Sequence, residues 1–133
     1  MLFRSVLGNE RPEASVAGEI APDRDFYDYD SKYAASSASS LHIPARIPPA
    51  TTQRVRELAI RMYQAMGCEG YARADFFVTN GEEVIASEVN TLPGFTNISM
   101  YPKLWEASGI GYSELLSRIL DLAFERHERR ASR

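Results

Sequence analysis

The sequence has little of what disulfide scaffolds, membrane spans and nucleic-acid binding require. One cysteine among 133 residues excludes an internal disulfide. No apolar run approaches the ~20 residues of a transmembrane helix, and the N-terminus has no apolar signal-peptide segment. A net charge of -3 leaves no basic stripe for nucleic acid. We therefore expect a cytoplasmic protein that binds neither membranes nor nucleic acids.

The composition that remains is ordinary for a globular domain. Hydrophobic residues make up 44% of the chain and charged residues 25%, and 133 residues are enough for one domain with a real core. Cys68 follows a predicted helix, and neither His42 nor His127 neighbours it in the sequence. We expect a packed thiol rather than a nucleophile.

A hairpin is predicted over residues 71–90, where two β-rich runs flank Asn80-Gly81, the strongest short hairpin signal. A two-residue turn places Asp75 diagonal to Glu88, and a four-residue loop places it directly opposite. Both registers keep the same face, and only a bulge would change it. The side chains expected on that face are Arg73, Asp75, Val84, Ala86, Glu88 and Asn90.

Asp75, Glu88 and Asn90 offer two carboxylates and one amide oxygen without a nearby cysteine or histidine. Such oxygen donors suit a hard cation, and Mg²⁺ is usually held by one or two carboxylates together with phosphate oxygens. We expect the three side chains to converge within about 6 to 7 Å. The alternative is a solvated hairpin face on which Arg73 pairs with Glu88 and nothing binds.

The residues after Asn90 connect this pattern to a known family. Residues 73–75, 88–96 and 99–105 closely resemble the C-terminal catalytic part of D-alanine–D-alanine ligases, members of the ATP-grasp superfamily. Further pieces at residues 6–8, 18–20, 26–33, 67–68 and 112–115 fall in the family's order and spacing. The resemblance implies an α+β fold, a mainly antiparallel sheet with flanking helices, truncated at its N-terminus.

The resemblance also implies the reaction and the residue roles. ATP phosphorylates one D-alanine, and the amine of a second D-alanine attacks the acyl phosphate, a step in peptidoglycan precursor synthesis. Two Mg²⁺ ions, with Mn²⁺ as an alternative, are implied between the phosphates and the protein, and the full-length enzyme is implied to be a homodimer. The implied metal ligands are Asp75, Glu88 and Asn90, the implied catalytic residues are Lys32, Tyr33, Arg73 and Gly94, and the implied acceptor-binding residues are Ser99 and the Met100 backbone.

Three further features complete the predicted organisation. Residues 1–5 do not resemble the family and are expected to be a non-native start, so the domain is predicted over residues 6–128, with a tail at 129–133. The first strand-like segments, at residues 5–7 and 13–20, are expected to have no N-terminal partners in this chain. Residues 21–50 are predicted to form an omega-type loop that closes over the site and carries Lys32 and Tyr33.

Apolar periodicity predicts three helices. The first spans residues 51–66 with Thr51 or Thr52 as its N-cap, the second spans 101–107, and the third starts near Ser113 and ends in a basic, solvated segment at 126–130. The third helix is expected to turn inward Leu115, Leu116, Ile119, Leu120 and Ala123.

Two other functions stay open beside the ligase. Another ATP-grasp ligase would share the acid-acid-amide pattern but should lack residues 91–99 and the tyrosine-rich loop. A non-catalytic binding module derived from the same fold would be expected to have lost a ligand among Asp75, Glu88 and Asn90, and none is lost.

Overall fold

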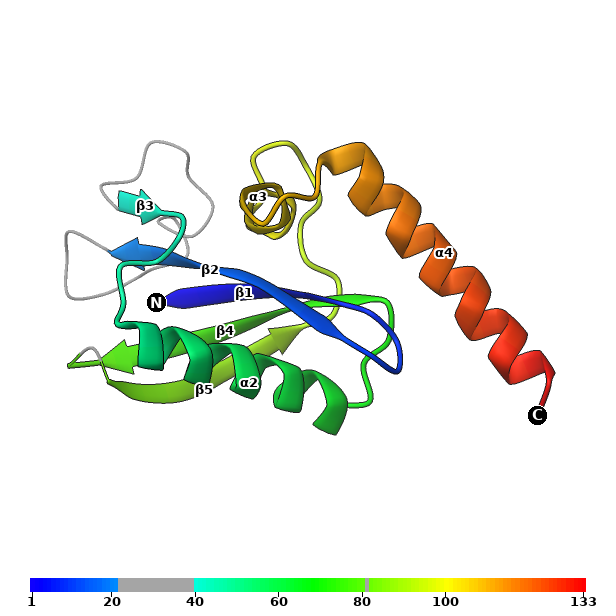
Figure 1. Ribbon diagram of the computed structural model, residues 1–133, viewed down its shortest axis with the longest axis horizontal. Coiled ribbons are helices and arrows are strands. Elements are labelled where there is room, and N and C mark those ends of the chain that lie inside the picture. Colours follow the sequence, from blue (N-terminus) through cyan, green and yellow to red (C-terminus); the bar gives the residue numbers. More distant parts are fainter. Residues whose placement is uncertain (22–39, 81) are drawn as a thin grey trace.

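The computed structural model describes residues 1–21, 40–80 and 82–133 (Figure 1). In this part of the chain, five strands form one antiparallel sheet in the order β3-β2-β1-β4-β5. The strands are β1 (Leu2–Leu7), β2 (Glu13–Ala21), β3 (Ser40–His42), β4 (Tyr71–Thr79) and β5 (Glu83–Asn90). The helices are α2 (Pro49–Ala65), α3 (Met100–Ala107) and α4 (Tyr112–Ala131).

Helices cover both faces of the sheet, as Figure 1 shows. Alternate residues of β1 supply the two cores, because side chains on a strand point to opposite faces. Leu2 and Val6 pack with Val55 of α2 in one core, and Leu7 packs with Trp105 of α3 in the other. The second core also receives Leu115 from α4, so α3 and α4 lie on the face opposite α2.

The β4–β5 hairpin reaches its register by two compensating irregularities. Three residues, 80–82, separate the strands, and near this loop Phe76 pairs with Ala86. A bulge at the next step restores the direct pairing of Asp75 with Glu88 and of Arg73 with Asn90. The bulge therefore keeps these four side chains on one face.

The same bulge overturns part of the sequence prediction. Val84 and Ala86, expected beside Asp75, pair with Val78 and Phe76 instead. These partners belong to the core face under α2, where Phe76 is buried and Val78 and Val84 pack around it. The prediction failed because an odd loop length shifts the register by one residue, which exchanges the two faces for the half of β5 next to the loop. Beyond the bulge, Glu88 and Asn90 return to the predicted face.

Helix α2 begins earlier than predicted. Its N-cap is Pro48 rather than Thr51 or Thr52, and no side chain caps it. Proline suits the first helical turn, because its missing N–H has no helical partner there and its φ angle is already helical. Thr51 is consequently a buried residue inside the first turn.

Helix α4 is longer than predicted and turns a narrower face inward. Leu115 is buried, and Ile119 and Leu122 pack against its cluster. The expected core residues Leu116 and Leu120 are 40% and 60% exposed, and Ala123 is exposed too. The predicted inward face was therefore too broad by these three residues.

The basic end of α4 is not simply solvated. Arg126, Arg129 and Arg130 all pair with Glu69, which precedes β4. These ion pairs connect the last turns of the helix to the sheet, which corrects the expectation of a solvated tail.

Strand β1 has partners on both sides, and both of them lie C-terminal to it in the chain. It pairs with β2 and, across the sheet, with β4 from much later in the chain. The predicted loop over residues 21–50 is also interrupted: β2 includes Ala21, β3 covers Ser40–His42, and α2 starts at Pro49. Lys32 and Tyr33 lie outside the described residues. Within the described ranges, no helix is long and apolar enough to cross a membrane.

Candidate active site

A buried ion pair forms the base of the candidate site. Arg73 Nε donates to Asp75 Oδ1 at 2.8 Å, and Arg73 Nη2 donates to Asp75 Oδ2 at 2.9 Å. The two residues are two positions apart on β4 and therefore share a face. The Asp75 side chain is 0% exposed and that of Arg73 10% exposed. This bidentate geometry fixes both groups in position.

Strand β5 brings Glu88 and Asn90 to the same face, each directly opposite a member of the pair. Arg73 Nη2 lies 4.0 Å from Glu88 Oε1, and half of the Glu88 side chain is exposed. The same Nη2 atom lies 2.9 Å from Asp75 Oδ2, so one guanidinium nitrogen contacts both carboxylates. The distance between Asp75 Oδ2 and Glu88 Oε1 therefore cannot exceed these two distances added together. Glu88 is therefore the accessible acid of the group.

Asn90 is held by its own backbone. Its Oδ1 accepts a hydrogen bond from the Leu92 N–H at 3.1 Å, an Asx-type turn that ends the strand. The turn starts the loop that carries Gly94 and Ser99. Asn90 thus joins the acidic face to the second half of the predicted site.

The donor set fits a hard cation. The two bonds from Arg73 use two of the roughly four lone-pair sites of the Asp75 carboxylate, and Arg73, Asp75 and Glu88 make polar contacts beyond those given above. In the described part of the chain, no cluster of three or more His, Cys, Asp and Glu side chains is present. A metal site here would consist of two acids and an amide, which is typical of Mg²⁺ with phosphate ligands.

The loop before α3 places Gly94 against Ser99. A Cβ atom on Gly94 would lie 3.1 Å from Ser99 Oγ, so a side chain there would crowd the serine. The Thr96 N–H donates to Ser99 Oγ at 2.9 Å, and Thr96 Oγ1 lies 2.9 Å from the same atom. Ser99 occupies the N-cap position of α3 but makes no side-chain cap bond.

Met100 opens α3 and turns its side chain away from this loop. A Cβ atom on Gly18 of β2 would lie 3.3 Å from Met100 Sδ, which places the thioether against the sheet. Its backbone remains at the first turn of the helix, where N–H groups lack helical acceptors. The loop therefore presents a glycine, a serine hydroxyl and a helix N-terminus close together.

A sequence model of the family described as "D-ala D-ala ligase C-terminus" matches residues 3–121. The chain belongs to this ligase family. D-alanine–D-alanine ligase A of Salmonella typhimurium is 53% identical over 123 residues, which cover 92% of this chain and 34% of that protein. The Shouchella clausii D-alanine–D-alanine ligase is 54% identical over 125 residues, 94% of this chain and 34% of its own length. The chain thus spans about a third of these relatives.

Solved structures of the family share the fold. D-alanine–D-alanine ligase from Coxiella burnetii superposes with a TM-score of 0.83 at 37% identity, covering 98% of this chain and 33% of that one. The Bacillus anthracis ligase, solved in complex with ATP, has a TM-score of 0.77 at 30% identity, and the match covers 97% of this chain and 41% of that one. VanG D-Ala:D-Ser ligase from Enterococcus faecalis has a TM-score of 0.78 at 36% identity, and the match covers 91% of this chain and 35% of that one. The predicted family and fold class are confirmed.

Three residues around the candidate site were not singled out from the sequence. The Phe3 ring lies under the Arg73 guanidinium, with Cζ 5.1 Å from the ring centroid. Thr96 holds Ser99, and Tyr112 Oη donates to the Phe95 carbonyl at 2.7 Å. Thr96 and Tyr112 stand within family-like segments, which was the available signal. Phe3 had none, because it falls in the stretch expected to be non-native.

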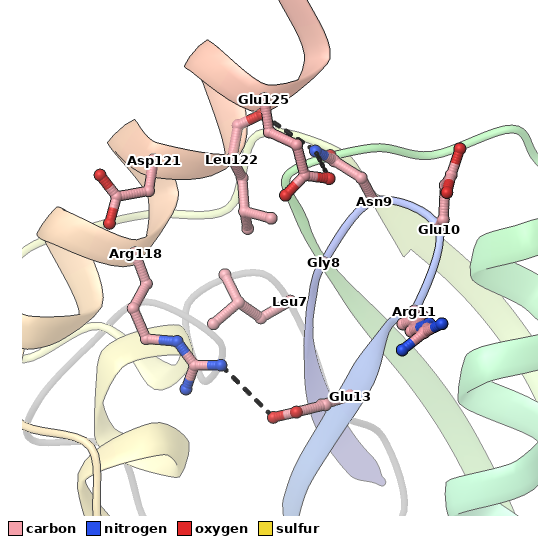
Figure 2. Close-up of a pocket in the computed structure, with 10 residues that line it drawn as sticks. All are labelled: Leu7, Gly8, Asn9, Glu10, Arg11, Glu13, Arg118, Asp121, Leu122 and Glu125. Carbon is pink, nitrogen blue, oxygen red and sulfur yellow. Dashed lines mark hydrogen bonds and ion pairs between the residues drawn. The ribbon is translucent and has the colours of Figure 1, made fainter. Parts of the chain in front are cut away.

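A cavity of about 400 Å³ lies elsewhere, between the β1–β2 turn and α4 (Figure 2). Arg118 and Glu13 pair across it at 3.5 Å, and Asn9 donates to the Leu122 carbonyl at 2.9 Å. None of the predicted site residues that the structure describes lines it. The candidate site is therefore the hairpin face with the adjoining loop, and this cavity is separate from it.

Proposed function

We propose that the chain is the C-terminal part of an ATP-dependent D-alanine–D-alanine ligase that joins two D-alanines through an acyl phosphate for peptidoglycan precursor synthesis. The observation that carries the proposal is the shared face of Arg73, Asp75, Glu88 and Asn90, followed directly by the Gly94–Ser99 loop. Relatives with this name at 53% and 54% identity support it.

The acidic face would handle the phosphates of ATP. Asp75, Glu88 and Asn90 would hold two Mg²⁺ ions, or Mn²⁺, which would supply positive charge to neutralise the transferring phosphoryl group. Glu88 suits a shared ligand because half of its side chain is exposed. Asp75 suits a fixed ligand because Arg73 holds both of its oxygens.

Arg73 and Gly94 would stabilise the oxyanion of the tetrahedral intermediate. The guanidinium is fixed in advance by Asp75, and donors that need no reorganisation contribute a few kcal/mol each. The backbone N–H of Gly94 would be the second donor. Lys32 would contact the transferred phosphoryl group, and Tyr33 would close the loop over the acceptor.

The N-terminus of α3 would receive the carboxylate of the second D-alanine. No side chain caps its first turn, so its N–H groups suit an anion. When Thr96 donates both its N–H and its hydroxyl to Ser99 Oγ, both acceptor sites of the serine are used. The Ser99 proton is then directed outward, as a donor to the carboxylate.

A D-alanine–D-serine ligase is the second candidate. The structure of VanG D-Ala:D-Ser ligase superposes on this chain with a TM-score of 0.78. Both reactions would use the same acidic face and differ only in the acceptor. Tyr33 favours D-alanine by the family resemblance. We also propose that the full-length enzyme is cytoplasmic and homodimeric.

The test uses a restored enzyme, in which residues 2–133 follow the N-terminal two thirds of the Salmonella typhimurium relative. We expect D-alanine-dependent phosphate release from Mg-ATP, with D-alanyl-D-alanine as the main product in competition with D-lactate or D-serine. Predominant D-alanyl-D-serine would favour the second candidate, and no ligation would refute the proposal. Glu88→Gln should lose far more activity than Ser87→Ala, and equal losses would argue against the role of Glu88.

The 133-residue chain alone is expected to be catalytically silent. Phosphoryl transfer depends on holding nucleotide, metal and acceptor together, and the relatives carry about two thirds of their length outside the matched region. Phosphate release by the isolated chain within about tenfold of the restored enzyme would contradict this expectation.

A further inference from the structure

One peptide unit in the acceptor loop is held from both sides. The carbonyl of Phe95 accepts a hydrogen bond from Tyr112 Oη at 2.7 Å. The N–H on the other side of that peptide, which belongs to Thr96, donates to Ser99 Oγ at 2.9 Å. Because a peptide unit is planar, fixing both of its polar groups fixes its orientation. This unit directly follows Gly94 in the chain and is hydrogen-bonded to Ser99.

The side chain of Phe95 anchors the same loop to the sheet and to α4. The centroid of its ring lies 6.0 Å from that of Tyr71 of β4, 5.6 Å from that of Tyr101 of α3 and 5.3 Å from that of Tyr112 of α4. Tyr101 is itself fixed, because its hydroxyl donates to the Val6 carbonyl of β1 at 2.9 Å. Tyr112 is therefore the member of this aromatic group that also bonds the loop backbone.

We propose that Tyr112 is a positioning residue for the acceptor site, which it controls by fixing the Phe95–Thr96 peptide. The inference rests on the proposed function, which assigns Ser99 to the carboxylate of the second D-alanine and Gly94 to the oxyanion that forms when its amine attacks. Tyr112 does not contact substrate in this role. Its hydroxyl acts through the loop, which keeps the Gly94 N–H and the Ser99 hydroxyl in a common orientation.

The effect should be selective for the acceptor. Asp75 and Glu88 are placed by the β4–β5 pairing and the Arg73 ion pair, none of which involves Tyr112. Gly94 and Ser99, by contrast, are in contact with each other within the loop that Tyr112 holds. Loosening the loop should weaken acceptor binding and leave ATP binding unchanged.

The experiment compares Tyr112→Phe with Tyr63→Phe in the restored enzyme. Each change removes one hydroxyl that donates to a backbone carbonyl, since Tyr63 Oη bonds the Gly8 carbonyl at 2.6 Å. Tyr112→Phe should lower kcat/KM for the acceptor D-alanine about five- to tenfold, the size of one lost hydrogen bond, with the KM for ATP unchanged. Tyr63→Phe should alter neither constant while lowering the melting temperature.

A second readout does not depend on turnover. Hydrogen exchange of the Thr96 amide should accelerate in Tyr112→Phe and stay at the parent rate in Tyr63→Phe. Faster exchange with an acceptor-selective loss supports the proposal. Unchanged exchange, or equal changes in the ATP and acceptor constants, overturns it. If the parent enzyme does not ligate D-alanine, the proposed function fails and the acceptor role of Tyr112 with it, while the exchange result still reports whether Tyr112 holds the loop.

Discussion

Two buried arginines on neighbouring strands have opposite electrostatic surroundings. Arg73 of β4 faces the candidate site and is bound by both oxygens of Asp75. Arg4 of β1 is 0% exposed and donates to the carbonyls of Ser15 and Thr52. Its Nε atom has no hydrogen-bond partner, and no carboxylate in the described part of the chain forms an ion pair with it.

The difference separates a buried charge that a carboxylate balances from one that its surroundings disfavour. Burial, with a smaller contribution from nearby Arg56, lowers the pKa of Arg4 to about 10, which shows that the surroundings disfavour its charged form. Arg73 has a carboxylate beside it and an aromatic ring beneath it. Breaking each arrangement in turn should therefore change different properties: activity for Arg73, and stability for Arg4.

The largest expected effect on activity is at Arg73. In the restored enzyme, Arg73→Lys keeps the charge but loses the planar, bidentate donor, so kcat should fall about 100-fold. Arg4→Lys makes the same change at the other buried arginine and should leave kcat within about twofold of the parent. Steady-state phosphate release measures both. Equal losses would show that Arg73 has only a structural role.

The next effect is on folding. Asp75→Asn would leave Arg73 without its carboxylate in a buried position, and breaking one side of such a pair costs about 3 to 5 kcal/mol. Urea unfolding of the 133-residue chain measures it, with Trp105, the one tryptophan of the sequence and 3% exposed, as the fluorescent probe. Asp121→Asn, at an exposed acid, should change stability by less than about 0.5 kcal/mol. A loss below about 1 kcal/mol at Asp75 would contradict the prediction.

The comparison also shows how far sequence patterns reach. Alternation along two strands predicted that Asp75, Glu88 and Asn90 share a face, yet the real register combines a three-residue loop with a bulge. The two irregularities cancel at the site, but between them Val84 and Ala86 lie on the core face instead of the predicted face. Loop length and bulges depend on how the whole sheet packs, for which a local motif gives little signal.

Side-chain partners were predicted less well than faces. The alternative interpretation of the hairpin paired Arg73 with Glu88, and these two lie 4.0 Å apart, but Asp75 is the closer partner of Arg73. That alternative considered cross-strand neighbours and overlooked that residues two apart on one strand can bond when burial excludes water. Arg4 shows the same limit, because no local pattern marks this arginine of β1 as one that lies fully buried against α2.

A smaller gain is expected from removing the second arginine. Arg4→Met keeps much of the side-chain volume and removes a buried charge that pairs with no carboxylate among the described residues, so the 133-residue chain should become more stable by about 1 to 2 kcal/mol. The same unfolding measurement applies, and Arg61→Met on the exposed side of α2 serves as control, with a change below about 0.5 kcal/mol. A loss of stability at Arg4 would mean that its two carbonyl bonds outweigh the cost of burying it.

The smallest expected effect concerns the ring beneath Arg73. Phe3 is 2% exposed, and a cation over a buried ring contributes about 0.5 to 2 kcal/mol beyond packing. Phe3→Leu also loses packing, and this loss must be separated from the loss of the cation. The substitution is therefore made both in the parent and in an Arg73→Met, Asp75→Leu double variant. In that variant an apolar pair replaces the ion pair at little cost to stability. Phe3→Leu should cost about 0.5 to 1 kcal/mol more in the parent than in that background, because only the parent has a cation to lose. An equal cost in both would show that Phe3 supports Arg73 by packing alone.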